Sequence, residues 1–167
     1  MAKYYYLKST LPYLRFGKAP AVKVRSFLEE CAKWMNSADM EAILGATLGD
    51  NDLREKEQKA SLDWKKFDIA LRREIADIRK DKRAEQGTKR AKYIIGQETP
   101  LDAEIAFEKN RWDHLEDREA LYEFDINDLI IYFLKLQIAE RLASFDKDEG
   151  EGVFYKLCEV KNGQTEG

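Results

Sequence analysis

The sequence predicts an all-α protein: an elongated helical bundle of long helix hairpins, over 53–98 and 99–145, behind a short N-terminal segment that is irregular or strand-like. Apolar residues recur at spacings of three and four over most of the chain, and no strong period-two alternation appears after residue 22. Charged residues make up 37% of the chain and hydrophobic residues 44%, which is enough for one buried core. We expect a single helical domain over 1–160 and a flexible tail over 161–167.

The N-terminal segment is rich in tyrosine and is interrupted by prolines and a glycine before residue 21. Its aromatic run at 4–7 is consistent with a short strand or a short helix, followed by an irregular loop. The aromatic side chains either pack over the helical core or form an edge that binds a partner. In the second case Tyr4, Tyr5 and Tyr6 are the docking residues.

An amphipathic helix is predicted next, because apolar side chains recur on one face. These residues are Val24, Phe27, Leu28, Cys31 and Met35. Ser37 is the expected N-cap of a second, short helix that runs to about residue 48. Residues 49–52 (Gly-Asp-Asn-Asp) then form a turn.

The longest predicted helix extends from about residue 53 to about residue 85. Its apolar stripe consists of Trp64, Phe67, Leu71, Ile75 and Ile78. Lys65 and Asp68 lie off this stripe, and Asp68 forms a favourable i,i+4 pair with Arg72. As one continuous helix the segment would be roughly 50 Å long. A helix of that length is longer than a compact domain of this size is wide, so we expect it to project from the domain or to pack along another long helix.

The C-terminal half carries clear helix-start signals. Thr99 as N-cap with Pro100 at the first helical position predicts the start of one helix. A final helix begins at Asp125 or Asn127 and has the broadest apolar face of the chain. We therefore expect this last helix to be the most buried one, at the centre of the bundle.

Opposite charges are concentrated in consecutive segments: residues 72–92 hold nine Lys or Arg and four Asp or Glu, whereas residues 93–134 hold three and eleven. Three interpretations are open: antiparallel helices that neutralise each other, a bipolar surface that docks proteins, and a nucleic-acid site. The overall balance of 29 Lys+Arg against 32 Asp+Glu, with no aromatic residues interleaved in the basic stretch, disfavours nucleic acid. The basic candidates for a partner surface are Arg79, Lys80, Lys82, Arg83, Lys89 and Arg90.

No motif for catalysis or cofactor binding is found in the sequence. His114 is the single histidine, which excludes multi-histidine metal sites and paired Glu-x-x-His motifs. We interpret His114 as a solvated residue on a helix surface. P-loop, GxGxxG and GxSxG patterns are absent as well. We therefore expect a protein that is not an enzyme, with no metal, no cofactor and no small-molecule substrate.

Cysteine usage and hydropathy indicate a cytoplasmic protein. Cys31 and Cys158 form no CxxC pair and are interpreted as reduced thiols. The N-terminus has no hydrophobic signal segment. The longest apolar run, 129–134, is far shorter than the roughly 20 residues that a membrane span needs. Contact with a membrane is expected only indirectly, through a complex.

Several stretches together resemble a small bacterial family of unknown function. They comprise Tyr4-Tyr5-Tyr6-Leu7 with Leu11-Pro12, Phe16 and Pro20, then residues 27–31, 71–79 and 124–141. Members of that family are encoded in operons for bacterial V-type (A/V-type) ATP synthases. They distantly resemble the all-helical, funnel-shaped C-subunit, which joins the central shaft of those machines to the membrane ring. The resemblance covers most of the chain from residue 4 to about residue 157.

The resemblance implies a non-catalytic connector or accessory protein of a V-type ATPase, which links the rotor shaft to the membrane ring or aids assembly. Its implied partners are rotor or ring subunits, and its implied location is the cytoplasm, peripheral at the inner membrane. The chain is much shorter than the funnel-shaped protein, so it supplies part of such a funnel or forms one as a homo-oligomer. The alternative is a cytosolic helical interaction module with another partner, and nucleic-acid binding is a less favoured one.

Overall fold

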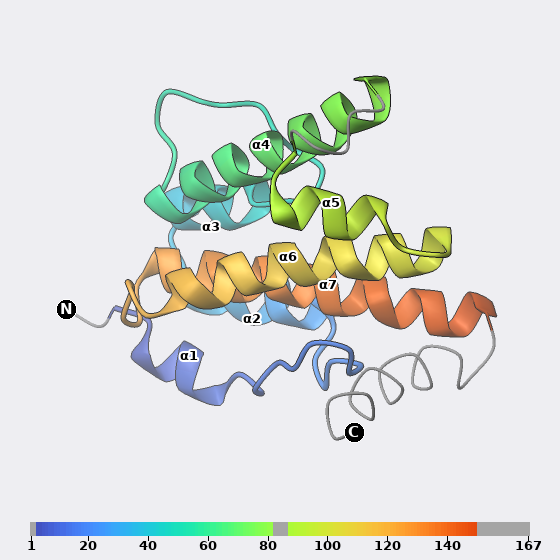
Figure 1. The fold of residues 1–167 in the computed structure, drawn as a ribbon. Coiled ribbons are helices and arrows are strands. Elements are labelled where there is room, and N and C mark those ends of the chain that lie inside the picture. Colours follow the sequence, from blue (N-terminus) through green and yellow to red (C-terminus); the bar gives the residue numbers. More distant parts are fainter. Residues whose placement is uncertain (1–2, 82–86, 150–167) are drawn as a thin grey trace.

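The computed structural model describes residues 3–81 and 87–149, which form seven helices and no strand (Figure 1). The helices are α1 (Tyr5–Thr10), α2 (Val24–Trp34), α3 (Ser37–Gly45), α4 (Lys59–Asp81), α5 (Lys89–Ile95), α6 (Pro100–Glu119) and α7 (Ile126–Glu149). The predicted all-α class is confirmed. The predicted tail, Cys158 and the candidate residues Lys82 and Arg83 lie outside the described residues.

Helix α7 is the centre of the fold. It contacts α2, α3, α4 and α6, and the run 129–136 is buried on every side. The sequence explains this burial, because apolar side chains occupy nearly every position of that run and leave no polar face. The predicted central position of this helix is confirmed.

The other helices are arranged around α7 in layers (Figure 1). Helix α6 packs along α7, α4 packs on α7 and touches α6, and α5 packs on both α4 and α6. Helices α2 and α3 cover further sides of α7, and α1 packs on α2. A main apolar cluster surrounds α7, and a smaller one lies between α4, α5 and α6, with Leu71, Ile75 and Ile94 among its members. The predicted hairpin pairing and elongated shape stay predictions.

The aromatic run near the N-terminus is a helix and not a strand. Tyr4 and Leu7, three residues apart, are both buried, whereas Tyr5 and Tyr6 point outward. This spacing matches the period of a helix, because residues three apart share one face. A strand would have placed Tyr4 and Tyr6 on the same side.

Helix α4 is shorter than predicted, since it begins at Lys59 and not near residue 53. Its start is fixed from another helix: the backbone N–H of Ala60 donates to the side chain of Asn127 at 3.0 Å. The preceding loop is held by the buried Lys65, which donates to the carbonyl of Asp52 at 2.7 Å and to the carboxylate of Glu57. The predicted apolar stripe on α4 is confirmed.

The predicted start of α6 is confirmed, that of α7 is one residue away from each predicted position, and the N-cap of α3 is shifted by one residue. The Thr99 hydroxyl accepts the backbone N–H of Asp102 at 3.1 Å, with Pro100 as the first residue of α6. Helix α7 begins at Ile126, between the two predicted positions. The N-cap of α3 is Asn36 and not Ser37, because the amide oxygen of Asn36 accepts the N–H of Asp39 at 2.8 Å.

Candidate functional site

The three tyrosines predicted as docking residues have different environments. Tyr4 is only 3% exposed, its hydroxyl donates to the carboxylate of Asp39, and its backbone N–H donates to the carbonyl of Phe124 at 2.9 Å. Tyr4 therefore belongs to the core and is not available to a partner. Tyr5 and Tyr6 are 48% and 73% exposed, and the Tyr5 ring packs edge-on against Phe124. The core-packing interpretation holds for Tyr4, and the outward position holds for the other two.

The basic candidate residues also fall into two groups, exposed ones and one that is part of the fold. Arg79 and Lys80, near the end of α4, and Lys89, at the start of α5, are exposed and form no ion pair with a described residue. Arg90 is different: its guanidinium donates to both carboxylate oxygens of Glu74, at 2.7 and 3.1 Å, and lies over the Phe67 ring. These hydrogen bonds hold the pKa of the Glu74 carboxyl below its usual value. Arg90 therefore joins α5 to α4 as a structural residue.

The aromatic and basic candidates do not form one surface. Helix α1 lies at the lower left of Figure 1, and the end of α4 lies at the upper right. A single partner site would have to reach across the whole molecule to include both. The basic surface is therefore separate from the aromatic one.

Two arginines of the basic segment pair with carboxylates of α4 and not with the acidic segment. Arg72 pairs with Asp68 and Arg90 pairs with Glu74, and both carboxylates belong to α4. The acidic segment is neutralised from other parts of the chain, by Lys8, Lys135 and Arg141. The positive charges at the end of α4 are thus left facing outward.

One face of α4 carries cations at regular spacing. Lys59, Lys66, Arg73 and Lys80 are seven residues apart and exposed. Seven residues are close to two turns, so these side chains form a stripe along the helix. A second stripe, of Leu62, Ile69 and Ala76, runs beside it with the same spacing and is partly or fully exposed. We call the two stripes together the outward face of α4. Asp77 is an exposed acidic residue on this face.

A cleft of about 220 Å³ adjoins the outward face at Ala76, between α4, α5 and α6. Its lining residues are Arg72, Ile75, Ala76, Arg79, Ile94, Ala103, Glu104 and Phe107. A second cleft of about 270 Å³ shares Arg72, Glu104 and Phe107 with the first. The first cleft thus combines an apolar floor with guanidinium groups at its rim.

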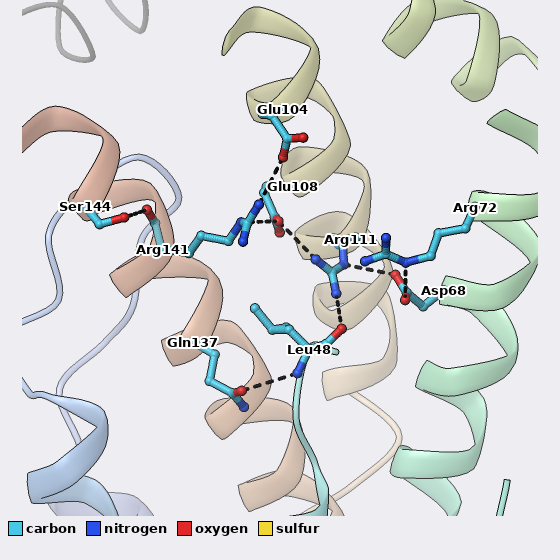
Figure 2. A network of polar contacts seen from close by, with 9 residues as sticks. All are labelled: Leu48, Asp68, Arg72, Glu104, Glu108, Arg111, Gln137, Arg141 and Ser144. Carbon is cyan, nitrogen blue, oxygen red and sulfur yellow. Dashed lines mark hydrogen bonds and ion pairs between the residues drawn. The ribbon is translucent and has the colours of Figure 1, made fainter. Parts of the chain in front are cut away.

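The second cleft is lined by members of a charge network that has a buried centre and ties three helices together (Figure 2). Arg111 of α6 is 3.1 Å from the carboxylate of Asp68 in α4, donates to Glu108 at 3.0 Å, and donates to the carbonyl of Leu48 at 2.9 Å. Arg141 of α7 contacts Glu108 and Glu104, each at 3.2 Å. Asp68 and Glu108 are both 0% exposed. The network therefore links α4, α6, α7 and the loop after α3.

Burial shifts the pKa values of two members of this network. Desolvation raises the pKa of the Glu108 carboxyl, although Arg111 and Arg141 act in the opposite direction. Desolvation likewise lowers the pKa of the Arg111 guanidinium against the pull of the two carboxylates. One oxygen of Glu108, Oε2, has no hydrogen-bond partner among the described residues. The contacts of this network are internal, and its clearest role is to fix the positions of the helices.

The interpretation of His114 as a solvated surface residue is wrong. Its ring stacks on Phe67 with centroids 3.8 Å apart, and its Nε2 lies 2.7 Å from the Asp63 carboxylate. Burial lowers the pKa of the imidazole, and the hydrogen bond to Asp63 opposes this effect only in part. Phe67 and Asp63, which pack against His114, belong to α4. They are far from His114 in the sequence, so the residues next to it could not predict its burial.

The described residues hold no group of three or more His, Cys, Asp or Glu side chains arranged to bind a metal ion. Within the same part of the chain, every helix is too short or too polar to cross a membrane. The geometry therefore defines a helical bundle whose most distinctive surface is the outward face of α4 with its adjoining cleft.

Comparison with known proteins places a domain of unknown function in the C-terminal part of the chain. Residues 90–163 match a family model described as "Protein of unknown function (DUF2764)". The match includes α6 and α7 and nearly all of α5, whereas α4 and its outward face precede it. No curated protein and no solved structure matches the chain.

Proposed function

We propose that this chain is a non-catalytic connector or accessory protein of a bacterial V-type ATPase, which binds a rotor or ring subunit through the outward face of α4. The sequence resemblance supports this class of partner. The surface supports the mode of binding, and one observation carries that argument: Lys66, Arg73 and Lys80 are aligned, exposed and without an ion pair to any described residue. The proposed location is the cytoplasmic side of the inner membrane, reached through the complex.

The contrast between inner and outer charges supports a docking role. The buried or half-buried cations Lys8, Lys65, Lys135 and Arg111 each contact at least one carboxylate. The cations of the outward face have no such role in the fold, so their removal leaves the packing intact. An aligned positive face accelerates encounter with an acidic partner and selects against basic ones.

The rigidity of α4 supports the proposed connector. The helix is anchored at three levels along its length: to α7 through Ala60 and Asn127, to α6 through Asp68 and Arg111, and to α5 through Glu74 and Arg90. A force applied to the outward face therefore reaches three other helices through direct contacts. A connector that transmits torque needs such a stiff docking element.

The test is a tagged pull-down from native membranes with mass spectrometry of the recovered proteins. Rotor or ring subunits in near-equal amounts support a built-in connector, and trace recovery supports an assembly factor. Recovery of other proteins without any V-type subunit overturns the proposal and leaves a cytosolic interaction module. Loss of the captured material after nuclease treatment instead indicates nucleic acid.

A matched pair of variants connects the pull-down to the surface. Arg73→Glu with Lys80→Glu reverses two charges on the outward face, and we expect recovery of the V-type subunits to fall strongly. Lys18→Glu with Lys23→Glu reverses two exposed charges elsewhere and should leave recovery unchanged. Equal loss in both double variants, or in neither, contradicts the assignment of the surface.

A further inference from the structure

We infer that the outward face of α4 and the adjoining cleft bind one amphipathic, acidic helix of the partner. The apolar side chains of that helix lie along Leu62, Ile69 and Ala76, and its carboxylates face the cations on either side. This inference rests on the proposed function, because it requires a protein partner. It adds the chemistry of the partner segment that the outward face binds.

The spacing of the outward face suits a second helix. Leu62, Ile69 and Ala76 repeat every seven residues and form a narrow apolar seam, with one residue for every two turns of the helix. Lys66, Arg73 and Lys80 each follow a seam residue by four positions and form one flank. Arg72 and Arg79 follow Ile69 and Ala76 by three positions and form the other flank. A central apolar seam between charged flanks is the arrangement that sets partner choice in helix pairs.

The cleft beside Ala76 provides an anchor for the bound helix. Ile75 and Ile94 supply apolar lining, and Arg72, Arg79 and Glu104 supply the charged lining. Its volume of about 220 Å³ admits one leucine or phenylalanine side chain. Helices that bind in grooves commonly insert such an anchor every one or two turns. A carboxylate one turn away on the same helix would then reach Arg79.

The charges around the cleft explain why the segment must be acidic. Arg72 pairs with Asp68, and Glu104 pairs with Arg141. Arg79 has no ion pair with a described residue, so the rim of the cleft keeps one positive charge open to a partner carboxylate. With Lys66, Arg73 and Lys80 on the opposite flank, an acidic helix is complementary to most of the face, and Asp77 is an exposed acidic residue on it that such a helix must avoid.

Two other occupants fit the observations less well. A second copy packed α4 against α4 brings the two cation stripes together, which is destabilising for like charges. A nucleic acid needs an exposed ring on which its bases can stack. Phe107, the aromatic residue of the cleft, is covered instead by the guanidinium groups of Arg72 and Arg111, at 5.1 and 5.0 Å from the ring centroid.

Site-specific photo-crosslinking in cells tests this inference with the full chain. A photoreactive amino acid replaces Ala76, which is exposed at the cleft, and a control carries it at Lys33 on α2. The crosslinked partner peptide is sequenced by mass spectrometry. We expect a predicted helical segment with apolar residues at intervals of seven and Glu or Asp beside them. No crosslink at Ala76, or a crosslink to RNA, to a second copy or to a segment without acidic residues, overturns the inference.

A synthetic peptide of the mapped segment then gives the energetics. We expect Arg79→Glu to weaken its binding about tenfold, because attraction becomes repulsion at the rim of the cleft. Arg25→Glu, a reversal of an exposed charge on α2, should change affinity less than about twofold. Equal affinity of wild type and Arg79→Glu contradicts the inference, provided that circular dichroism shows both to be folded.

These outcomes separate the inference from the proposed function. An acidic helix that belongs to a protein outside the V-type ATPase leaves the inference standing and removes the proposed function. A V-type protein that co-purifies but crosslinks only at Lys33 leaves the proposed function standing and removes the inference. Neither result can be mistaken for the other, because one reports the identity of the partner and the other reports the position of contact.

Discussion

Replacing Arg111 by methionine tests whether the buried charge network holds α4, α6 and α7 together. Arg111 is 2% exposed, and its two carboxylate partners, Asp68 and Glu108, are 0% exposed. Methionine fills much of the volume but leaves both carboxylates with one cation fewer and the Leu48 carbonyl without its donor. Breaking a buried pair in this way costs about 3–5 kcal/mol. Domains of this type have a total unfolding free energy of about 5–15 kcal/mol, so the loss is a large fraction.

Urea unfolding followed by tryptophan fluorescence measures this loss, because Trp64 and Trp112 are both buried. With a denaturant slope of about 2 kcal/mol per molar, the midpoint should fall by about 2 M. The melting temperature should fall by roughly 10 °C. Arg25→Met is the matched control, since Arg25 forms an exposed i,i+4 pair with Glu29. We expect that variant to change the free energy of unfolding by less than about 0.5 kcal/mol.

A rescue experiment identifies the cause of the loss. If stranded carboxylates are responsible, adding Asp68→Asn and Glu108→Gln to Arg111→Met should restore part of the lost stability, because neutral amides are less costly to bury. A cost below about 1 kcal/mol for Arg111→Met alone would refute the reasoning. So would a further large loss in the triple variant, which would mean that packing and not charge is responsible.

Three further predictions follow from individual residues. Thr99→Ala removes the N-cap of α6 and should lower the free energy of unfolding by about 1 kcal/mol, measured by thermal melting; an unchanged melt speaks against the cap. Tyr132 is buried, which raises its pKa from 10.0 to about 12, so stability should fall as the pH rises above 10, and Tyr132→Phe should flatten that fall. Equal slopes for the two proteins would be inconsistent with this burial. The lowered pKa of His114 means that the unfolded chain binds the proton more tightly, so stability should fall as the pH drops below about 6.5. His114→Phe should reduce that fall, and an NMR titration of the imidazole at or above its ordinary pKa would contradict the prediction.

The parts of the fold that the sequence predicted correctly depend on local signals. The Thr99-Pro100 start of α6 and the apolar stripe of α4 are set by residues within a few positions of each other. The central place of α7 follows from the apolar residues around its whole circumference. Such signals lie within one segment and need no knowledge of its neighbours.

The sequence predictions were wrong for features that depend on a residue far away in the sequence. Asn127 accepts the Ala60 N–H and fixes where α4 begins. Lys65 is buried although it lies off the apolar stripe, because the loop before α4 supplies a carboxylate and a carbonyl. Sequence periodicity predicts which side of a helix faces inward, but it does not show which charged residues find partners there.

The candidate site was only partly predictable. Arg79, Lys80 and Lys89 were identified as exposed cations from the charge asymmetry, and their outward position agrees with it. The longer stripe formed with Lys66 and Arg73 was missed, although its seven-residue spacing is visible in the sequence. The cleft could not have been found in this way, because its lining comes from three separate helices.

The central position of α7 also has a consequence for biosynthesis. Phe27, in the second helix to be made, stacks on Phe133 at 5.4 Å, and the Tyr132 hydroxyl donates to the carbonyl of Pro12 at 2.7 Å. Phe133 and Tyr132 are among the last described residues to leave the ribosome. Until α7 emerges, the apolar sides of α2 and α3 lack their main packing partner, so the nascent chain remains in an aggregation-prone state. The bundle is therefore expected to fold only after α7 has emerged from the ribosome, and the demand on chaperones should end at that point.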